Sequence, residues 1–217
     1  MRSAVTPIAR AAAALLAIVA WAGLLVQFSA TLEIQGSLGS TLWALLWYFT
    51  ITTNLLVAIV FTGFAAGRSV FANSSLLGSV ALSIVLVGVI YGLLLHGLTE
   101  LSGGSAIANV LLHMATPVLV PVFWLAFVPK GRLKRGDILL WAIYPLGYLV
   151  YALIRGEFTR RYPYPFMNVN ELGWASTLLN AFLIAVAFLV ASWLFIWLDT
   201  LLARRIPQPS GTRSLTN

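Results

Sequence analysis

The sequence predicts an all-α integral membrane protein, a single bundle of six transmembrane helices. Hydrophobic residues fill 60% of its 217 positions and charged residues only 9%, whereas soluble domains carry roughly 25% charged residues. The mean hydropathy is +0.95. The net charge is +7, but the Lys and Arg residues are spread over short loops and termini. That pattern sets membrane topology and argues against nucleic-acid binding.

Six apolar segments are long enough to cross a bilayer, which takes roughly 20 residues. They lie near 8–29, 41–65, 75–98, 106–128, 137–155 and 174–202. The first follows Arg2 and Arg10, as the apolar part of a signal peptide would, but it runs on without a clean small-residue cleavage site. We therefore interpret it as a retained span. Residues 1–205 form one transmembrane domain, and residues 206–217, with several Pro, Gly, Ser and Thr residues, are predicted to be disordered.

The basic residues predict the orientation. Ten of the thirteen Lys and Arg residues lie at the amino terminus, in the loops after the second and fourth spans, and in the tail. Because basic loops stay in the cytoplasm, both termini are predicted to be cytoplasmic, in a multi-pass protein of a bacterial inner (plasma) membrane. Arg155, Arg160 and Arg161 fall in a loop on the opposite side. That loop either is solvated and binds lipid headgroups, or grips an anionic group of a substrate.

The second span is unusually rich in hydroxyl groups. Thr50 and Asn54 are four residues apart, Thr53 is three from Thr50, and Trp47 precedes them by one turn, so these side chains share a helix face. A threonine in a membrane helix commonly bonds its own backbone carbonyl or joins two helices. Asn54 needs hydrogen-bond partners if it is buried. The face is either contact surface between helices or part of a polar site.

The fourth span contains an imidazole beside a proline. Asn109 and His113 are four residues apart and share a face. Pro117 follows four residues later, so the carbonyl of His113 loses its helical partner and the helix is predicted to kink. An ionisable group at membrane depth marks a functional site by default. The alternative is a histidine that hydrogen-bonds across the bundle and serves only packing.

The depths of the two polar faces are compatible. At 1.5 Å per residue, Thr50 lies roughly 14 Å and His113 roughly 11 Å below the outer ends of their spans. We therefore expect one polar pocket in the outer half of the bundle. Other polar candidates for the same pocket are Tyr91, His96, Asn109 and Asn180.

A hydroxyl and an imidazole are the minimum for nucleophilic acyl transfer, because the imidazole takes the hydroxyl proton while the oxygen attacks a carbonyl. The chain has no cysteine, which excludes disulfides, thiolate metal sites and a cysteine nucleophile. Its two histidines lack adjacent carboxylates, so no zinc or haem site, and no other cofactor, is expected.

Three short motifs point to a family. They are Phe49-Thr50, Asn109-x-x-x-His113 followed by Pro117, and Tyr164-Pro165-Phe166. In these motifs, and in segment order over nearly the whole chain, the sequence resembles the six-transmembrane androgen-induced protein family. Its animal members are threonine hydrolases that cleave fatty acid esters of hydroxy fatty acids. The resemblance implies Thr50 as nucleophile and His113 as base. The animal enzymes carry an aspartate three residues after the threonine, where this chain has Thr53.

The leading hypothesis is an intramembrane lipid ester hydrolase that acts on fatty-acyl esters with Thr50 and His113. The candidate substrate-binding residues are Trp47, Thr53, Asn54, Tyr91, His96, Asn109, Tyr164 and Asn180. A small-molecule or proton transporter, in which His113 titrates inside a polar cavity, is the first alternative. A non-catalytic lipid-binding membrane protein is the second.

Overall fold

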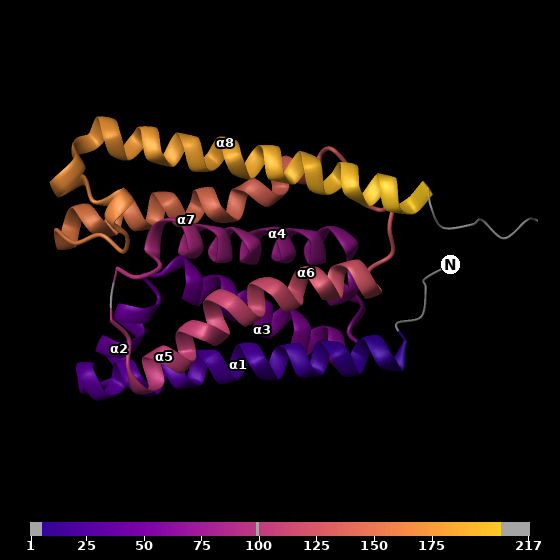
Figure 1. Cartoon of the computed structure of the whole chain (residues 1–217), viewed down its shortest axis with the longest axis horizontal. Helices are drawn as coiled ribbons and strands as arrows, with labels where there is room; N and C mark the ends of the chain where they lie inside the picture. The colour runs from indigo at the N-terminus through magenta and orange to yellow at the C-terminus, as the bar shows by residue number, and fades with distance from the viewer. Residues whose placement is uncertain (1–5, 99, 205–217) are drawn as a thin grey trace, which may run out of the picture.

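The computed structural model describes residues 6–98 and 100–204, and within these ranges every regular element is helical (Figure 1). In chain order the elements are α1 (Pro7–Gln35), α2 (Leu38–Leu45), α3 (Phe49–Ala65), the 3₁₀ turn η1 (Ser69–Ala72), α4 (Ser74–Ile90), the π turn η2 (Tyr91–Leu95), α5 (Gly103–Val110), the π turn η3 (Leu111–Ala115), α6 (Thr116–Phe127), α7 (Asp137–Thr159), the 3₁₀ turn η4 (Pro165–Met167) and α8 (Val169–Arg204). The predicted all-α class is confirmed for the described residues. The tail 206–217, predicted to be disordered, and Arg2 lie outside them.

Several helices are long and apolar enough to cross a membrane. α1, α7 and α8 qualify alone, α4 qualifies together with η2, and α5, η3 and α6 qualify as one unit. α2 and α3 qualify only as a pair, and the pair is bent by 98°. These lengths support the membrane prediction, but the prediction of one continuous helix over 41–65 is wrong. The chain leaves the helical path at Leu46–Tyr48.

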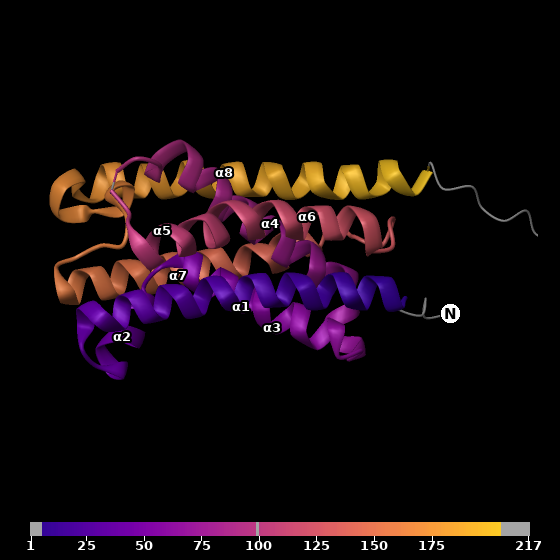
Figure 2. The same cartoon turned by 60° about the horizontal axis from the view of Figure 1, so that its bottom comes forward.

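The helices pack as two pairs with a third pair between them (Figures 1 and 2). α1 and α3 lie side by side, α7 and α8 form the opposite side, and α4 packs on α6 in the middle. Small buried residues on α1, among them Ala13 and Ala20, let it approach its neighbours closely. Gly23 serves the same end, because a Cβ there would lie 2.7 Å from Cδ2 of Leu112 in η3. The π turn is thus held tightly against α1.

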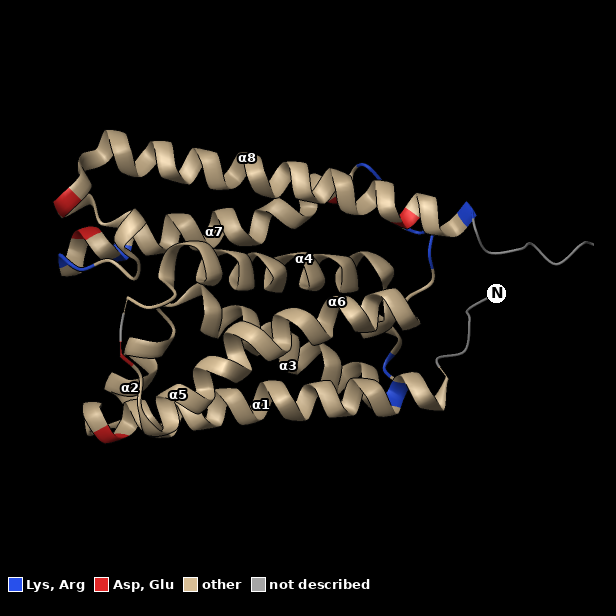
Figure 3. Cartoon of the chain, viewed as in Figure 1, with Lys and Arg blue, Asp and Glu red and all other residues tan. Residues whose placement is uncertain are grey.

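Charged residues gather at the ends of the bundle (Figure 3). Arg10 lies in the first turns of α1 and Arg204 in the last turn of α8, and the two helix ends lie at the same end of the bundle. Glu33 and Glu171 lie near the opposite end, in the last turns of α1 and the first turn of α8. The long stretches between the ends are apolar.

Side chains of α7 stabilise the break between α2 and α3 by hydrogen bonds to its main chain. The hydroxyl of Tyr148 donates to the carbonyl of Trp47 at 2.8 Å. Nη2 of Arg155 donates to the carbonyl of Trp43 at 2.6 Å, and its guanidinium lies 3.8 Å from the centre of the Trp43 ring. A break in a membrane helix frees main-chain groups that lipid cannot bond. Here α7 supplies the missing donors.

The expectation that Arg155 lies in a loop is wrong. α7 continues to Thr159, so Arg155 is helical, and only 5% of its surface is exposed. Its bond to the Trp43 carbonyl and its stacking on two tryptophan rings explain why a buried cation is tolerated there. Arg160 and Arg161 do lie in an exposed turn, where Arg160 pairs with Glu157 at 2.9 Å.

Replacing Tyr148 by Phe is expected to lower the free energy of unfolding by about 1–3 kcal/mol, because the carbonyl of Trp47 then loses its donor inside the bundle. Denaturant titration of the purified protein in detergent measures the change. Tyr48→Phe is the control, since Tyr48 is 40% exposed and its hydroxyl has no hydrogen bond within the described part of the chain. That variant should stay within about 0.5 kcal/mol of wild type. Equal losses in the two variants would contradict a role for Tyr148 at the break.

Candidate active site

The structure brings Thr50 and His113 into direct contact. Oγ1 of Thr50 lies 3.1 Å from Nε2 of His113, which is hydrogen-bond distance. Thr50 is the second residue of α3 and is buried, whereas His113 lies in the π turn η3 and is half-buried. Two segments 63 residues apart in the chain thus place a hydroxyl against an imidazole.

The hydroxyl of Thr50 is available because α3 begins at Phe49. In mid-helix, a threonine hydroxyl commonly bonds the carbonyl four residues earlier. For Thr50 that carbonyl belongs to Leu46, which lies in the break and not in the helix. The first amides of a helix also lack helical acceptors, and the amide of Thr50 has none in hydrogen-bond geometry among the described residues. The break therefore frees both the hydroxyl and the amide of Thr50.

The π turn that holds His113 is stabilised from α3. In this register the amide of Thr116 bonds the carbonyl of Leu111, and the next amide in line is that of Pro117, which has no hydrogen. The carbonyl of Leu112 is therefore left without a main-chain donor. Nδ2 of Asn54 donates to it at 3.1 Å, and the hydroxyl of Thr116 donates at 3.3 Å.

The structure adds a π turn to the predicted effect of the proline. The fourth span widens around His113, and the carbonyl of Leu112 takes its bond from Asn54. Asn54 is fully buried. Its Nδ2 also donates to the carbonyl of Thr50 at 2.9 Å, and its Oδ1 accepts from Thr116 at 2.7 Å. Asn54 thus connects Thr50 to the turn that holds His113.

Aromatic stacking orients the imidazole. The ring of Tyr91 lies 4.4 Å from that of His113 at an interplanar angle of 26°, and Nδ2 of Asn109 donates to the Tyr91 hydroxyl at 2.7 Å. Asn109 therefore reaches His113 through Tyr91 and not by direct pairing of the side chains. His96 is exposed and meets Tyr91 edge-on at 5.6 Å.

The second ring nitrogen of His113 has no orienting carboxylate. Nδ1 is buried and has no hydrogen-bond partner among the described residues. Thr53, at the position where the resemblance places an aspartate in the animal enzymes, is fully buried and bonds the hydroxyl of Tyr144 at 2.9 Å. It lies against α7, away from the imidazole.

Two other predicted site residues support the surroundings of the site. Trp47 lies in the break, where the Arg155 guanidinium stacks on its ring at 4.6 Å. Nδ2 of Asn180, on α8, donates to the carbonyl of Phe166 at 3.0 Å and so fixes η4. Neither of them contacts Thr50 or His113.

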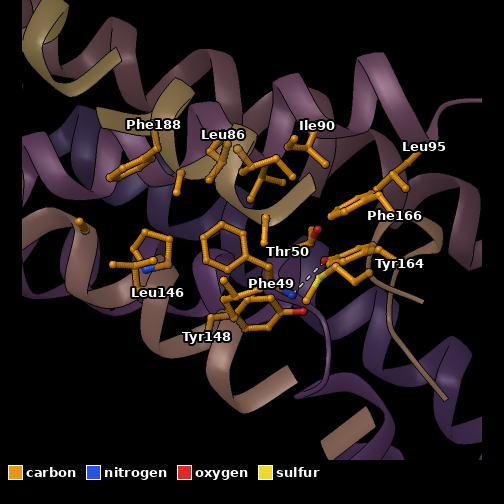
Figure 4. A pocket seen from close by; sticks show the side chains of 18 of the residues that line it. Phe49, Thr50, Leu86, Ile90, Leu95, Leu146, Tyr148, Tyr164, Phe166 and Phe188 are labelled. Carbon is orange, nitrogen blue, oxygen red and sulfur yellow. Dashed lines mark hydrogen bonds between the residues drawn. The ribbon is translucent and has the colours of Figure 1, made fainter. Parts of the chain in front are cut away.

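An apolar cavity opens beside Thr50 (Figure 4). Its empty space, including the open mouth, is about 900 Å³. The side chains that line it come from α3, α4, α7, η4 and α8, and include Leu86, Ile90, Leu146, Ile184, Ala185 and Phe188. The polar groups at its wall are the hydroxyls of Thr50, Tyr148 and Tyr164.

Tyr164 closes the end of the cavity that holds Thr50 (Figure 4). Its hydroxyl oxygen accepts the amide of Phe49, the first residue of α3, at 3.0 Å. Burial raises the pKa of the Tyr164 phenol, because a phenolate is poorly solvated away from water. The phenol therefore stays protonated at neutral pH. Within the described ranges, no group of three or more His, Cys, Asp or Glu residues could hold a metal ion.

Sequence reasoning missed Thr116 and the free end of α3. Thr116 is fully buried and bonds Asn54, and its position directly before Pro117 was the available signal, since a hydroxyl there can replace the missing amide. The free amide of Thr50 had no signal, because the break contains neither Pro nor Gly.

Comparison with known proteins adds no relative: no family model, curated protein or solved structure matches this chain. The resemblance to the androgen-induced protein family therefore stays a prediction. What the chain can do rests on the contacts of Thr50, His113 and the cavity.

Replacing Asn54 by Leu is expected to lower the free energy of unfolding by roughly 2–4 kcal/mol, because the Leu112 carbonyl and the Thr116 hydroxyl lose buried partners. A double-mutant cycle with Thr116→Val tests the connection. The double variant should lose less stability than the sum of the two single variants, by about 0.5–3 kcal/mol, the range for residues in one hydrogen-bond network. Additive losses, measured by denaturant titration, would contradict a joint role at the π turn.

Proposed function

We propose that this protein is an intramembrane lipid ester hydrolase in which Thr50 is the nucleophile and His113 is the general base. The observation that carries the proposal is the 3.1 Å contact between Oγ1 of Thr50 and Nε2 of His113 at the wall of an apolar cavity. A hydroxyl becomes an effective nucleophile when an adjacent base takes its proton. An apolar cavity beside that hydroxyl suits a fatty-acyl chain.

The first half of the reaction forms an acyl-threonine. Thr50 gives its hydroxyl proton to Nε2 of His113, which requires the neutral tautomer protonated at Nδ1. The Thr50 oxygen attacks the ester carbonyl carbon, and the carbonyl electron pair moves to its oxygen. As the carbonyl re-forms, the ester C–O bond breaks and the alcohol leaves with the proton from His113.

The second half returns the enzyme. A water molecule gives one proton to Nε2 of His113, and its oxygen attacks the acyl carbon. The bond to Thr50 breaks, Thr50 takes the proton back, and the fatty acid leaves. The imidazole side is the polar side of the site, where His113 and Asn109 are half-buried and His96 is exposed, and we propose that water comes from there. The acyl chain occupies the opposite, apolar side.

His113 works here without a carboxylate. Its ring is held by the stack against Tyr91 and by the hydroxyl of Thr50, so its orientation does not depend on an acidic residue. A carboxylate would stabilise the imidazolium that forms during the reaction. We therefore expect a slower enzyme than one with a complete triad. Fatty acid esters of hydroxy fatty acids are the substrates that the family resemblance implies.

We further propose six spans with both termini in the cytoplasm of a bacterial inner membrane, the bent pair of α2 and α3 counting as one span. The support is the end of the bundle that α1 and α8 share, where Arg10 and Arg204 lie. Basic residues favour the cytoplasmic side. The cavity and Thr50 then open towards the outer half of the membrane.

Thr50→Ala removes the nucleophile and His113→Ala removes the base. Each variant is therefore expected to lower ester hydrolysis by about 10³-fold or more. Both variants should also lose covalent labelling by a lipid-like fluorophosphonate probe. Hydrolysis of long-chain acyl esters by the purified protein and in-gel fluorescence measure the two effects.

Thr62→Ala is the matched control for the nucleophile. Thr62 lies about three turns further along α3, and its hydroxyl bonds the carbonyl of Ala58. This variant should label and hydrolyse like wild type. If wild type does not label, or if Thr50→Ala labels equally well, the catalytic proposal fails.

Ala185→Phe is expected to shorten the cavity, because Ala185 lines it. Displacing about three methylene groups of a bound chain, worth about 0.8 kcal/mol each, should lower kcat/KM for long-chain esters roughly 50-fold. Butyrate esters should be hydrolysed as by wild type. Ala187→Phe, on the exposed face of the same helix, is the control and should leave chain-length preference unchanged. Equal losses for short and long esters would contradict acyl binding in this cavity.

A further inference from the structure

We propose that the hydroxyl of Tyr164 and the main-chain amide of Thr50 form the oxyanion hole of the hydrolase, which makes Tyr164 a catalytic residue. The inference rests on the proposed function, since an oxyanion arises only if Thr50 attacks an ester. It assigns the two groups that bind the carbonyl oxygen. It also explains why the nucleophile stands at the start of a helix.

Tyr164 is held rigidly at the end of the cavity. Its ring stacks on that of Phe166 at 5.2 Å with an interplanar angle of 6°, and it meets the ring of Tyr48 edge-on at 6.0 Å. The amide of Met167 donates to the carbonyl of Tyr164 at 3.0 Å, which closes the turn η4. Tyr164 is 9% exposed. Its hydroxyl therefore needs little rearrangement before it can act.

The hydroxyl proton of Tyr164 is left to donate. The phenol oxygen accepts the amide of Phe49, so one of its lone pairs is occupied and its O–H points elsewhere. In Figure 4 the Tyr164 hydroxyl lies at the side of the cavity where Thr50 stands, and the amide of Thr50 follows that of Phe49 in the first turn of α3. Acceptance from the Phe49 amide also polarises the phenol, which strengthens it as a donor.

The amide of Thr50 supplies the second donor. Among the described residues it has no acceptor in hydrogen-bond geometry, and it belongs to the first turn of a 17-residue helix. The aligned peptide dipoles of such a helix place partial positive charge at this end. Chymotrypsin-like proteases use the amide of the nucleophile itself in the same way. Negative charge that develops beside Thr50 thus meets an amide, a phenol and a helix terminus.

These groups account for the charge and the proton that move in the transition state. When the Thr50 oxygen attacks, the carbonyl oxygen gains the electron pair of the C=O bond, and the Thr50 proton goes to His113. The two donors bind that oxygen more strongly than the neutral carbonyl oxygen of the substrate, so they lower the barrier and not merely the energy of binding. Burial keeps the phenol protonated, so Tyr164 donates without transferring its proton.

Tyr164→Phe tests the assignment, because it removes the hydroxyl and leaves the ring in place. Loss of one oxyanion donor costs about 10²–10³ in kcat, so kcat for a long-chain ester should fall by that factor. KM should stay within about threefold, because the acyl chain still fills the cavity. Covalent labelling of Thr50 by the fluorophosphonate probe should slow by a similar factor. Equilibrium binding of a non-hydrolysable ether analogue of the ester should be unchanged.

Tyr151→Phe is the matched control. Tyr151 is a phenol on α7 that accepts a hydrogen bond from Arg155 and does not line the cavity. Its loss should leave kcat and the labelling rate as in wild type.

The outcomes separate the inference from the proposed function. If wild type hydrolyses the ester and Tyr164→Phe does so at the same kcat, the oxyanion assignment is overturned while the hydrolase stands. If Tyr164→Phe loses ether-analogue binding together with kcat, Tyr164 only caps α3, and the assignment is again overturned. If wild type shows neither hydrolysis nor labelling, both proposals fall.

Discussion

Main-chain groups inside a membrane must bond within the protein, and this constraint acts at the break between α2 and α3. A 98° bend at Leu46–Tyr48 removes helical hydrogen bonds where lipid offers no substitute. α7 replaces them with the hydroxyl of Tyr148 and the guanidinium of Arg155, and Tyr164 accepts the first amide of α3. The start of α3, and with it Thr50, is therefore fixed by side chains from the other half of the bundle.

The π turn η3 meets the same constraint from the opposite side of the site. Pro117 removes one amide, and Asn54 and Thr116 supply donors to the carbonyl of Leu112. Asn54 also donates to the carbonyl of Thr50. The same side chain therefore connects the π turn η3 to the start of α3 after the break. Irregular backbone is tolerated at membrane depth where the protein satisfies its hydrogen bonds, and side chains supply those bonds at both segments. These hydrogen bonds fix the positions of the Thr50 hydroxyl and the His113 imidazole.

The sequence was sufficient for the helical class and for most of the apolar segments, because hydropathy over about 20 residues is a local property. Residue type and depth also selected Thr50 and His113 as candidates. The break was not predictable, since no Pro or Gly marks it and its stability comes from Arg155 and Tyr148, about a hundred residues later. From the sequence alone, Arg155 is predicted in a loop and Thr53 is grouped with the site. Which helices touch is a tertiary property that periodicity along one helix does not contain.

The break also decides what kind of chemistry a threonine can offer. In a continuous helix the hydroxyl of Thr50 could bond a carbonyl one turn earlier, and its amide would be occupied by the helix. At the second position of α3 the helix holds neither group. Thr50 lines the apolar cavity, and the imidazole of His113 contacts its hydroxyl. An acyl chain in the cavity would then present its carbonyl between the free amide and the hydroxyl, while the leaving alcohol faces His113, Tyr91 and the exposed His96. The bend that the bundle must stabilise is thus the same feature that places Thr50 between the apolar cavity and the half-buried imidazole of His113.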